Sequence, residues 1–296
     1  MKTLRIEKKE YLRTGYDPHD IDIVEYTELT AEYNDNGLLT REERFNHDGS
    51  KNTLTLNVYN DNGKLLLTEQ YDQDNILLQK TENSYDEDGN ILSQTNYFGD
   101  ASDKYTSKYI YNDHKNLERI EVYFNDELDY VEKTFTYNDG YVDTEIENDD
   151  YGEVMYSTRY EYNEKGLLSK LTRDEIQNKD RRVYEFYYND NGDRVKDLVY
   201  DYGMKLIAKT NRNFDEQHRL LGYIEEDLDN YREIKIEHKD NLVVKNSILD
   251  RNSQIISWAE YEYDENGKEI HSMEYARDEV APEKYRVIQE TNFIRG

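Results

Sequence analysis

Carboxylates dominate the reactive chemistry of this 296-residue sequence, which has 66 Asp and Glu against 38 Lys and Arg and a formal net charge of -28. Two acidic runs are dense, "EIENDDYGE" (145–153) and "IEEDLDN" (224–230). Their acids are Glu145, Glu147, Asp149, Asp150 and Glu153 in the first, and Glu225, Glu226, Asp227 and Asp229 in the second. Like charges packed this closely repel one another, and a basic partner would relieve the repulsion. We therefore predict partner binding at both runs; a solvated acidic surface is the alternative.

Catalytic motifs are missing from the sequence. It has no Gly-rich phosphate loop, no Gly-x-Ser-x-Gly elbow and no His-Glu-x-x-His, and the absence of cysteine excludes thiol catalysis and zinc thiolates. Carboxylate pairs suited to glycoside hydrolysis could be drawn almost anywhere among so many acids, so they are no evidence for that reaction. We predict a non-enzymatic protein with no catalytic residue, no cofactor and no metal site.

Acidic turns such as Asp86, Glu87 and Asp88 before Gly89 offer oxygen ligands of the kind calcium prefers. No turn supplies the full run of donors that an EF-hand loop needs. Hairpin-turn chemistry is the preferred interpretation of these residues, with weak calcium binding as the alternative. The six histidines, also scattered, are interpreted as solvated turn residues: His19, His47, His114, His218, His238 and His271.

The charge also restricts the partners. A net charge of -28 opposes binding to nucleic acid or to an anionic membrane, and it favours a basic protein. No stretch approaches the roughly 20 apolar residues of a membrane-spanning helix, and the first residues carry no apolar signal segment. We expect a cytoplasmic protein.

The elements that position these acids follow an internal repeat. "YNDNGLLT" (33–40) returns as "YNDNGKLL" (59–66), and an aromatic or histidine anchor precedes a polar turn every 24 to 26 residues. The anchors are Tyr33, Tyr59, Tyr85, Tyr111, Tyr137, Tyr162, Tyr188, Phe214, His238 and Tyr263. A second, weaker turn lies about 12 residues after each first turn. Each repeat therefore holds two segments of strand length and two turns.

Alternating aromatics before the anchors, as at Tyr184, Phe186 and Tyr188, indicate strands with one better-buried face. We predict an all-β fold of about ten β-hairpin repeats in one elongated, coiled antiparallel sheet, either a superhelical ribbon or a spiral shell. The predicted organisation is a single repeat domain over 1–296, with an N-terminal cap (1–24), ten hairpin repeats (25–274) and a C-terminal cap (275–296). Caps are expected because a repeat array must cover its terminal edges.

Three motifs carry a family resemblance: "YEYDENGKEI" (261–270), "YEYNEKGLLSK" (160–170) and "FYYNDNGDRVK" (186–196). They resemble the bacterial YD repeats of Rhs proteins, and "YDEDGNILSQTNYFGD" (85–100) is similar to the MORN-like repeats of bacterial antitoxin and immunity proteins. Rhs toxins enclose a C-terminal toxin released at an Asp-Pro motif. The Asp-Pro of this sequence, Asp17-Pro18, lies near the other end, so we expect the neutralising side of such a system.

These observations lead to one functional expectation. The chain is predicted to be a protein-binding scaffold, an immunity protein or antitoxin that occludes a basic toxin. The alternative is a surface-associated or secreted carbohydrate-binding or adhesive module, whose tyrosine rows would stack on sugar rings.

Overall fold

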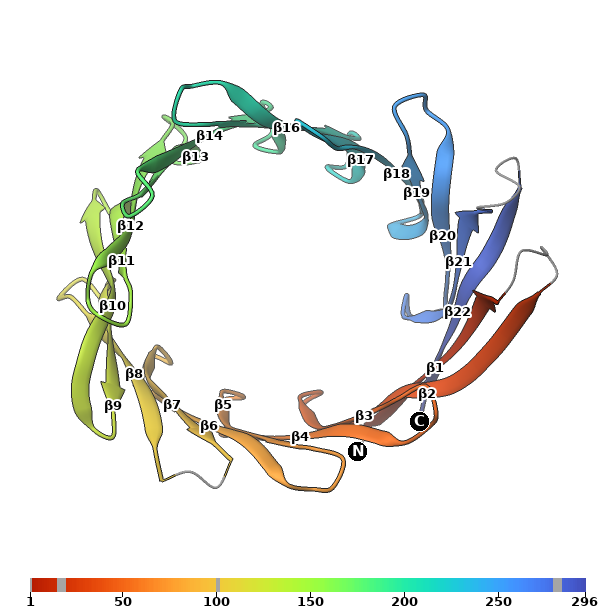
Figure 1. Ribbon diagram of the computed structural model, residues 1–296, viewed down its shortest axis with the longest axis horizontal. Coiled ribbons are helices and arrows are strands. Elements are labelled where there is room, and N and C mark those ends of the chain that lie inside the picture. The colour runs from red at the N-terminus through yellow and green to blue at the C-terminus, as the bar shows by residue number, and fades with distance from the viewer. Residues whose placement is uncertain (1, 15–19, 100–101, 279–283) are drawn as a thin grey trace. The chain divides into compact units, whose positions relative to one another are not determined.

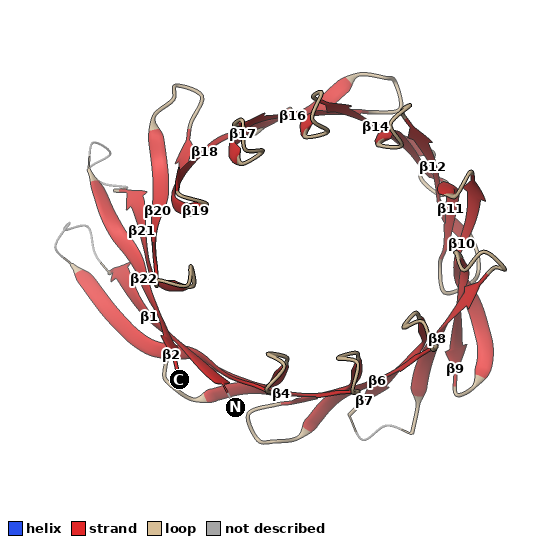
Figure 2. Ribbon diagram, turned by 180° about the vertical axis from the view of Figure 1, so that it is seen from behind, coloured by secondary structure: helices blue, strands red, loops and turns tan. Residues whose placement is uncertain are grey.

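The computed structural model describes residues 2–14, 20–99, 102–278 and 284–296, and over these residues the chain consists of strands and loops without a helix (Figure 2). The all-β prediction is confirmed. All strands belong to one sheet, in which chain neighbours pair antiparallel as hairpins. The strands are β1 (Lys2–Arg13), β2 (Ile21–Tyr33), β3 (Leu39–Phe45), β4 (Lys51–Tyr59), β5 (Leu65–Tyr71), β6 (Leu77–Tyr85), β7 (Ile91–Phe98), β8 (Lys104–Tyr111), β9 (Leu117–Phe124), β10 (Glu127–Asn138), β11 (Tyr141–Asn148), β12 (Val154–Tyr162), β13 (Leu168–Glu175), β14 (Asp180–Tyr188), β15 (Arg194–Tyr200), β16 (Leu206–Phe214), β17 (Leu220–Asp227), β18 (Tyr231–Lys239), β19 (Leu242–Leu249), β20 (Ile255–Tyr263), β21 (Glu269–Arg277) and β22 (Tyr285–Arg295).

The strands divide into two compact units. Unit 1 comprises Met1–Gln79, Leu220–Tyr223 and Tyr231–Gly296, and unit 2 comprises Lys80–Arg219 and Ile224–Asn230. Unit 1 therefore holds β1 to β5 and β18 to β22, while unit 2 holds β7 to β16. The single repeat domain stays a prediction.

The repeated polar turn has a local cause in the side chain after each anchor. In the turn at 60–63, the Asn60 side-chain oxygen accepts hydrogen bonds from the backbone N–H groups of Asn62 (3.0 Å) and Lys64 (2.9 Å). Gly63 donates to the Asn60 carbonyl and has φ +76°, a left-handed conformation that glycine adopts without steric cost. "YNDNG" is thus a hairpin turn that its own side chain and backbone close.

A β-bulge beside each turn needs a hydrogen-bond donor, and the anchor tyrosine of the next hairpin supplies it. The register shifts between Ile110 and Tyr111, where Tyr111 pairs with Leu117. The Tyr137 hydroxyl, 20 residues further on, donates to the Leu117 carbonyl at 2.8 Å. The bulge leaves Glu118 out of the pairing, and the hydroxyl gives the adjacent Leu117 carbonyl a partner from the next hairpin. The same bond recurs, again over 20 residues, at Tyr59–Leu39, Tyr111–Ile91, Tyr188–Leu168 and Tyr263–Val243.

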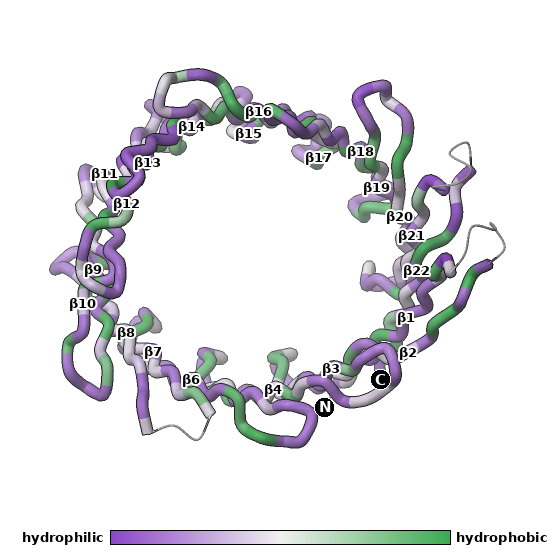
Figure 3. The backbone as a smooth tube through the Cα atoms, in the orientation of Figure 1, coloured by the Kyte–Doolittle hydropathy of each residue, from purple (hydrophilic) through white to green (hydrophobic). Residues whose placement is uncertain are grey.

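The sheet is thin, and few side chains are deeply buried. Among the described residues no large side chain is below 2% exposed, and the buried apolar residues are single positions in separate strands, such as Leu54, Val122 and Val183. Purple and green segments alternate along the strands in Figure 3, as expected for a sheet whose side chains point to its two faces in turn. Cross-strand pairs therefore supply most of the stabilisation.

The predicted open sheet, whether a superhelical ribbon or a spiral shell, is wrong. Strand β1 pairs antiparallel with β22, from Leu4 opposite Arg295 to Glu10 opposite Gln289, and also with β2 (Figure 1). The 22-stranded sheet is therefore closed, with the hydrogen-bonding topology of a β-barrel. The segments predicted as caps, 1–24 and 275–296, contain β1 and β22, so these ends cover each other. The physical reason is that pairing between β1 and β22 satisfies the hydrogen-bonding groups of both edge strands at once. Separate caps would have to cover each edge by itself.

A buried ion pair holds this closure. Both Arg13 Nη atoms donate to the two Asp278 carboxylate oxygens at 2.9 Å, and the side chains are only 11% and 8% exposed. The Arg286 guanidinium of β22 also donates to the Tyr11 carbonyl of β1 at 2.8 Å. Bidentate geometry of this kind is the strongest form of an Arg–carboxylate contact. Asp17-Pro18 and His19 lie outside the described residues.

The anchor hydroxyl gives a first prediction. Tyr137→Phe removes the donor to the Leu117 carbonyl and should lower the free energy of unfolding by about 1 kcal/mol, because a half-buried acceptor is left unpaired. Urea unfolding measures the change. Tyr151→Phe is the matched control, since this side chain is 86% exposed; an equal effect of the two changes would contradict the proposed role of the anchor bond.

The closure gives a second prediction. Asp278→Asn leaves the Arg13 charge buried without its countercharge, which should cost about 3 kcal/mol. Hydrogen exchange should then show loss of protection in β1 and β22, with β12 to β15 unaffected. Unchanged protection of β1 would show that the backbone pairing closes the sheet without the ion pair.

Candidate functional site: the second-turn edge of unit 2

The strands alternate in direction, so the turns gather at two opposite edges of each unit. Turns that follow even-numbered strands carry the anchor motif, and we call their side the first-turn edge. Turns that follow odd-numbered strands lie at the opposite side, the second-turn edge. Both predicted acidic runs end in turns of the second-turn edge of unit 2, after β11 and after β17.

The first acidic run begins on the sheet itself, where its acids are neutralised. Glu145 lies 2.8 Å from Lys133 Nζ and accepts a hydrogen bond from the Tyr160 hydroxyl at 2.6 Å. Glu147 lies 3.4 Å from both Lys133 Nζ and the Arg173 guanidinium. Burial raises the pKa of the Glu145 carboxyl, but the bonds from Lys133 and Tyr160 outweigh it and hold this pKa below its ordinary value. Glu145 and Glu147 are therefore structural acids of the sheet, against the prediction that they face a partner.

The rest of the first run forms the turn after β11. Asp149 accepts hydrogen bonds from the backbone N–H groups of Tyr151 (3.0 Å) and Glu153 (2.9 Å), so it caps the turn. Asp150 and Glu153 are exposed. Neither makes an ion pair with any residue that the structure describes. Of the five acids in this run, these two are available to a partner.

The second run divides in the same way. Asp227 caps the turn after β17 by accepting the N–H groups of Asp229 (2.9 Å) and Asn230 (2.7 Å), and hydrogen bonds from Asp229 and Asn230 lower the pKa of its carboxyl. Glu226 lies 3.8 Å from Lys209 Nζ. Glu225 and Asp229 are exposed. These two acids are the members of the second run that a partner could reach.

The structure places the two runs on one edge without merging them. Strands β12 to β16 lie between β11 and β17 in chain order, and neighbouring strands are roughly 4.8 Å apart, so the two turns are on the order of 30 Å apart. Two further turns, after β13 and β15, lie between them. The candidate site is therefore an edge of four successive turns rather than one acidic pocket.

Sequence reasoning missed the apolar side chains of these four turns. They are exposed in every one of the turns: Tyr151, Ile176, Tyr202, Met204 and Leu228. The signal was present in the sequence, because "DDYG", "DYGM" and "DLDN" put apolar residues where the first turns have Asn, Asp, Glu or Gln.

Two of the acids that line one hollow of unit 2 have partners. This hollow, about 590 Å³, is lined by Glu161, Lys170, Glu185 and Tyr187 among others. Glu161 lies 3.4 Å from Lys170 Nζ, and Glu185 accepts the Tyr187 hydroxyl at 2.8 Å. Across the described ranges, no group of three or more His, Asp and Glu residues could hold a metal ion.

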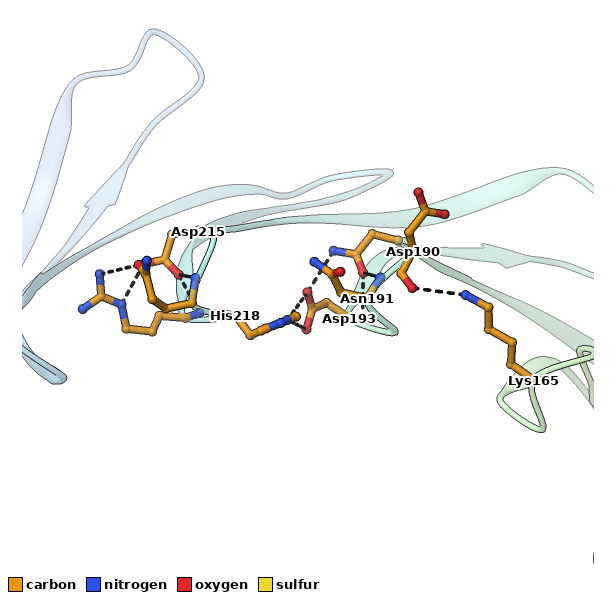
Figure 4. A network of polar contacts seen from close by, with 9 residues as sticks. Lys165, Asp190, Asn191, Asp193, Asp215 and His218 are labelled. Carbon is orange, nitrogen blue, oxygen red and sulfur yellow. Dashed lines mark hydrogen bonds and ion pairs between the residues drawn. The ribbon is translucent and has the colours of Figure 1, made fainter.

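The first-turn edge of unit 2 is polar and linked from turn to turn (Figure 4). Lys165 Nζ donates to the Asp190 carbonyl at 3.2 Å, and His218 Nδ1 lies 3.0 Å from the Asp193 carboxylate. Their residues come from the successive turns after β12, β14 and β16. His218 thus joins neighbouring turns, as an alternative to the solvated role predicted for it.

Comparisons with known proteins add little beyond the all-β class. No family model and no curated protein matches the sequence, so the YD-repeat and MORN-like resemblance stays a prediction. Among solved structures, a porin-like protein from Bacteroides uniformis is similar over 99% of this chain and 97% of its own, with 11% identity and a TM-score of 0.35. The Tc holotoxin pore of Photorhabdus luminescens matches 92% of this chain with 10% identity and a TM-score of 0.21. This chain spans 22% of that toxin chain.

Within the part of the chain that the structure describes, no helix is long and apolar enough to cross a membrane.

The partners of Glu145 give a third prediction. Glu145→Gln should lower the free energy of unfolding at pH 7 by about 1 to 2 kcal/mol, because it weakens the bonds from Lys133 and Tyr160. The folded pKa of Glu145 lies below its ordinary 4.5, so this stabilisation is present above pH 4.5 and is lost as the pH falls through the folded pKa. The gap between wild type and variant should therefore close in acid. Glu153→Gln, at an exposed acid, should leave stability unchanged; equal effects of both changes would mean that Glu145 has no structural role.

Proposed function

We propose that this chain is a non-enzymatic scaffold that binds a basic protein at the second-turn edge of unit 2. In the form that the YD-repeat resemblance implies, it is an immunity protein or antitoxin that covers a basic toxin. The observation that supports it is the division of the first acidic run: Glu145 and Glu147 on the sheet are neutralised by Lys, Arg and Tyr, while Asp150 and Glu153 in its turn, like Asp229 in the second run, are exposed.

Exposed charges of this kind act mainly on association. A cationic protein is attracted over roughly a Debye length, about 8 Å at physiological salt, and is oriented toward the acidic edge before contact. The same charges contribute little to the stability of the folded chain, because solvated acids pay no desolvation penalty and gain no countercharge. Exposed acids also stand in the first turns, as at Glu87, Asp113 and Glu164, so a preference of a basic protein for one edge is what the experiment must detect.

A charge-reversal pair tests the proposal and gives a fourth prediction. The edge variant carries Asp150→Lys, Glu153→Lys and Asp229→Lys; the control carries the same charge change at exposed acids of the first-turn edge, Glu87→Lys, Asp113→Lys and Glu164→Lys. Cytochrome c serves as the basic probe, and fluorescence anisotropy measures its affinity at low and physiological salt. The edge variant should bind about tenfold more weakly than the control, since a factor of ten needs only about 1.4 kcal/mol.

Two outcomes would contradict the proposal. Equal weakening in both variants would show that net charge alone attracts the probe, without a preferred edge. No binding by the wild type at low salt would show that the exposed acids do not take a basic protein.

A further inference from the structure

Four successive turns of unit 2 expose large apolar side chains to solvent. Tyr151 is 86% exposed, Tyr202 68% and Leu228 63%. Ile176 and Met204 complete the set, and we call these five residues the apolar row. Exposed apolar side chains that recur on one surface mark interaction sites more often than chance positions do.

Turn chemistry does not explain the apolar row. Five first turns of the same unit, "DEDG", "NDHK", "NEKG", "NDNG" and "DEQH", have no apolar side chain, and the sixth, "NDG" after β10, is followed by Tyr141, which is 46% exposed. Those turns close with the same backbone hydrogen bonds, for example Gly192 N–H to the Asn189 carbonyl and Met204 N–H to the Asp201 carbonyl. The hairpins would therefore form equally well with polar residues at the second-turn edge.

Met204 stands at a turn position that Lys115 and His218 also occupy with a positive φ. Its φ is +59°, a left-handed conformation that Gly152 and Gly192 supply in equivalent turns and that is strained for a methionine. Gly203 stands directly before it, without a positive φ. The turn thus keeps a flexible, exposed thioether in the position where glycine would relieve strain, and methionine is a favoured residue of adaptable binding surfaces.

We propose that the apolar row is the contact core of a docking surface for a basic protein whose own face presents apolar side chains between its lysines and arginines. This rests on the function proposed above. Asp150 and Glu153 flank Tyr151, and Asp229 follows Leu228, so exposed acids stand at the two ends of the row, while its middle turns expose Lys179 and Lys205. Exposed tyrosines are the expected anchors of such a core.

The net charge of the chain favours a basic protein as the occupant, and the length of the apolar row suits a protein interface. A second copy of this chain, at -28, and an anionic membrane would both meet like charge at the acidic ends of the row. Successive turns lie two strands apart, roughly 10 Å, so the row extends over about 30 Å. A row of that length fits within one side of a standard protein interface, which buries about 800 Å² per partner.

Two labelled peptides of about 10 residues test the inference, since an extended chain of that length spans the roughly 30 Å of the row. One alternates Lys with Leu and the other alternates Lys with Ser, so they share their charge and differ in apolar content. Fluorescence anisotropy gives both affinities at low salt. The wild type should prefer the Lys–Leu peptide about tenfold, and Tyr151→Ser with Tyr202→Ser should remove most of that preference.

A matched control and a strain-relieving variant complete the experiment. Leu92→Ser with Tyr187→Ser removes apolar residues, 42% and 44% exposed, from the strand ends beside the first-turn edge and should keep the preference. Met204→Gly should leave the urea midpoint unchanged or higher while it lowers the preference severalfold. A residue with a purely structural role would not weaken binding as it relieved strain.

The outcomes separate this inference from the proposed function. If the wild type binds both peptides equally, the apolar row contributes nothing, and the acidic scaffold stands without it. If the wild type binds neither, the proposed function fails, and the docking surface fails with it. If uncharged phosphatidylcholine vesicles bind the wild type but not the double Ser variant, the row contacts lipid and the protein partner is overturned.

Discussion

The hydrogen bond from an anchor tyrosine to a bulge carbonyl sets the spacing of much of this sheet. The turns after Tyr59, Tyr111 and Tyr162 are each followed by a bulge, where one residue is left out of the pairing. The hydroxyls of Tyr137 and Tyr188 reach carbonyls at such bulges 20 residues back, so one hairpin fixes the next. In a sheet without a thick core, this bond and the cross-strand pairs stabilise the fold, as core packing does in layered proteins. Tyrosine suits the position because it covers the strand with a ring and satisfies the carbonyl with a hydroxyl.

The thin sheet also determines which carboxylates need a partner. Half-buried carboxylates on the strands have partners, as Glu145 has in Lys133 and Tyr160. Exposed carboxylates are solvated by water, so Asp150 and Asp229 in the turns and Glu225 on β17 need no partner for the fold. Acids that share a sequence run therefore have different roles. Burial and the neighbouring strands decide between those roles.

Much of the fold could be predicted because its causes are local. The Asn60 cap, the glycine at Gly63 and the aromatic anchor before them act within a few residues, so a pattern in the sequence reports them directly. Closure could not be predicted in this way. Strands β1 and β22 lie at opposite ends of the chain and lack the anchor pattern, and their pairing depends on which edges meet in space.

The features of the candidate site also differ in whether they have a local cause. The sequence by itself determined the strands, the turns and the acid content, because hydrogen bonds and alternation within about 26 residues fix them. Only the tertiary structure decided that Glu145 and Glu147 are neutralised while Asp150, Glu153 and Asp229 are exposed, since Lys133 and Arg173 come from neighbouring strands. It also decided that Tyr151, Tyr202 and Leu228 share one edge. The physical reason is that strand direction alternates, so turns from every second strand gather at one side of the sheet.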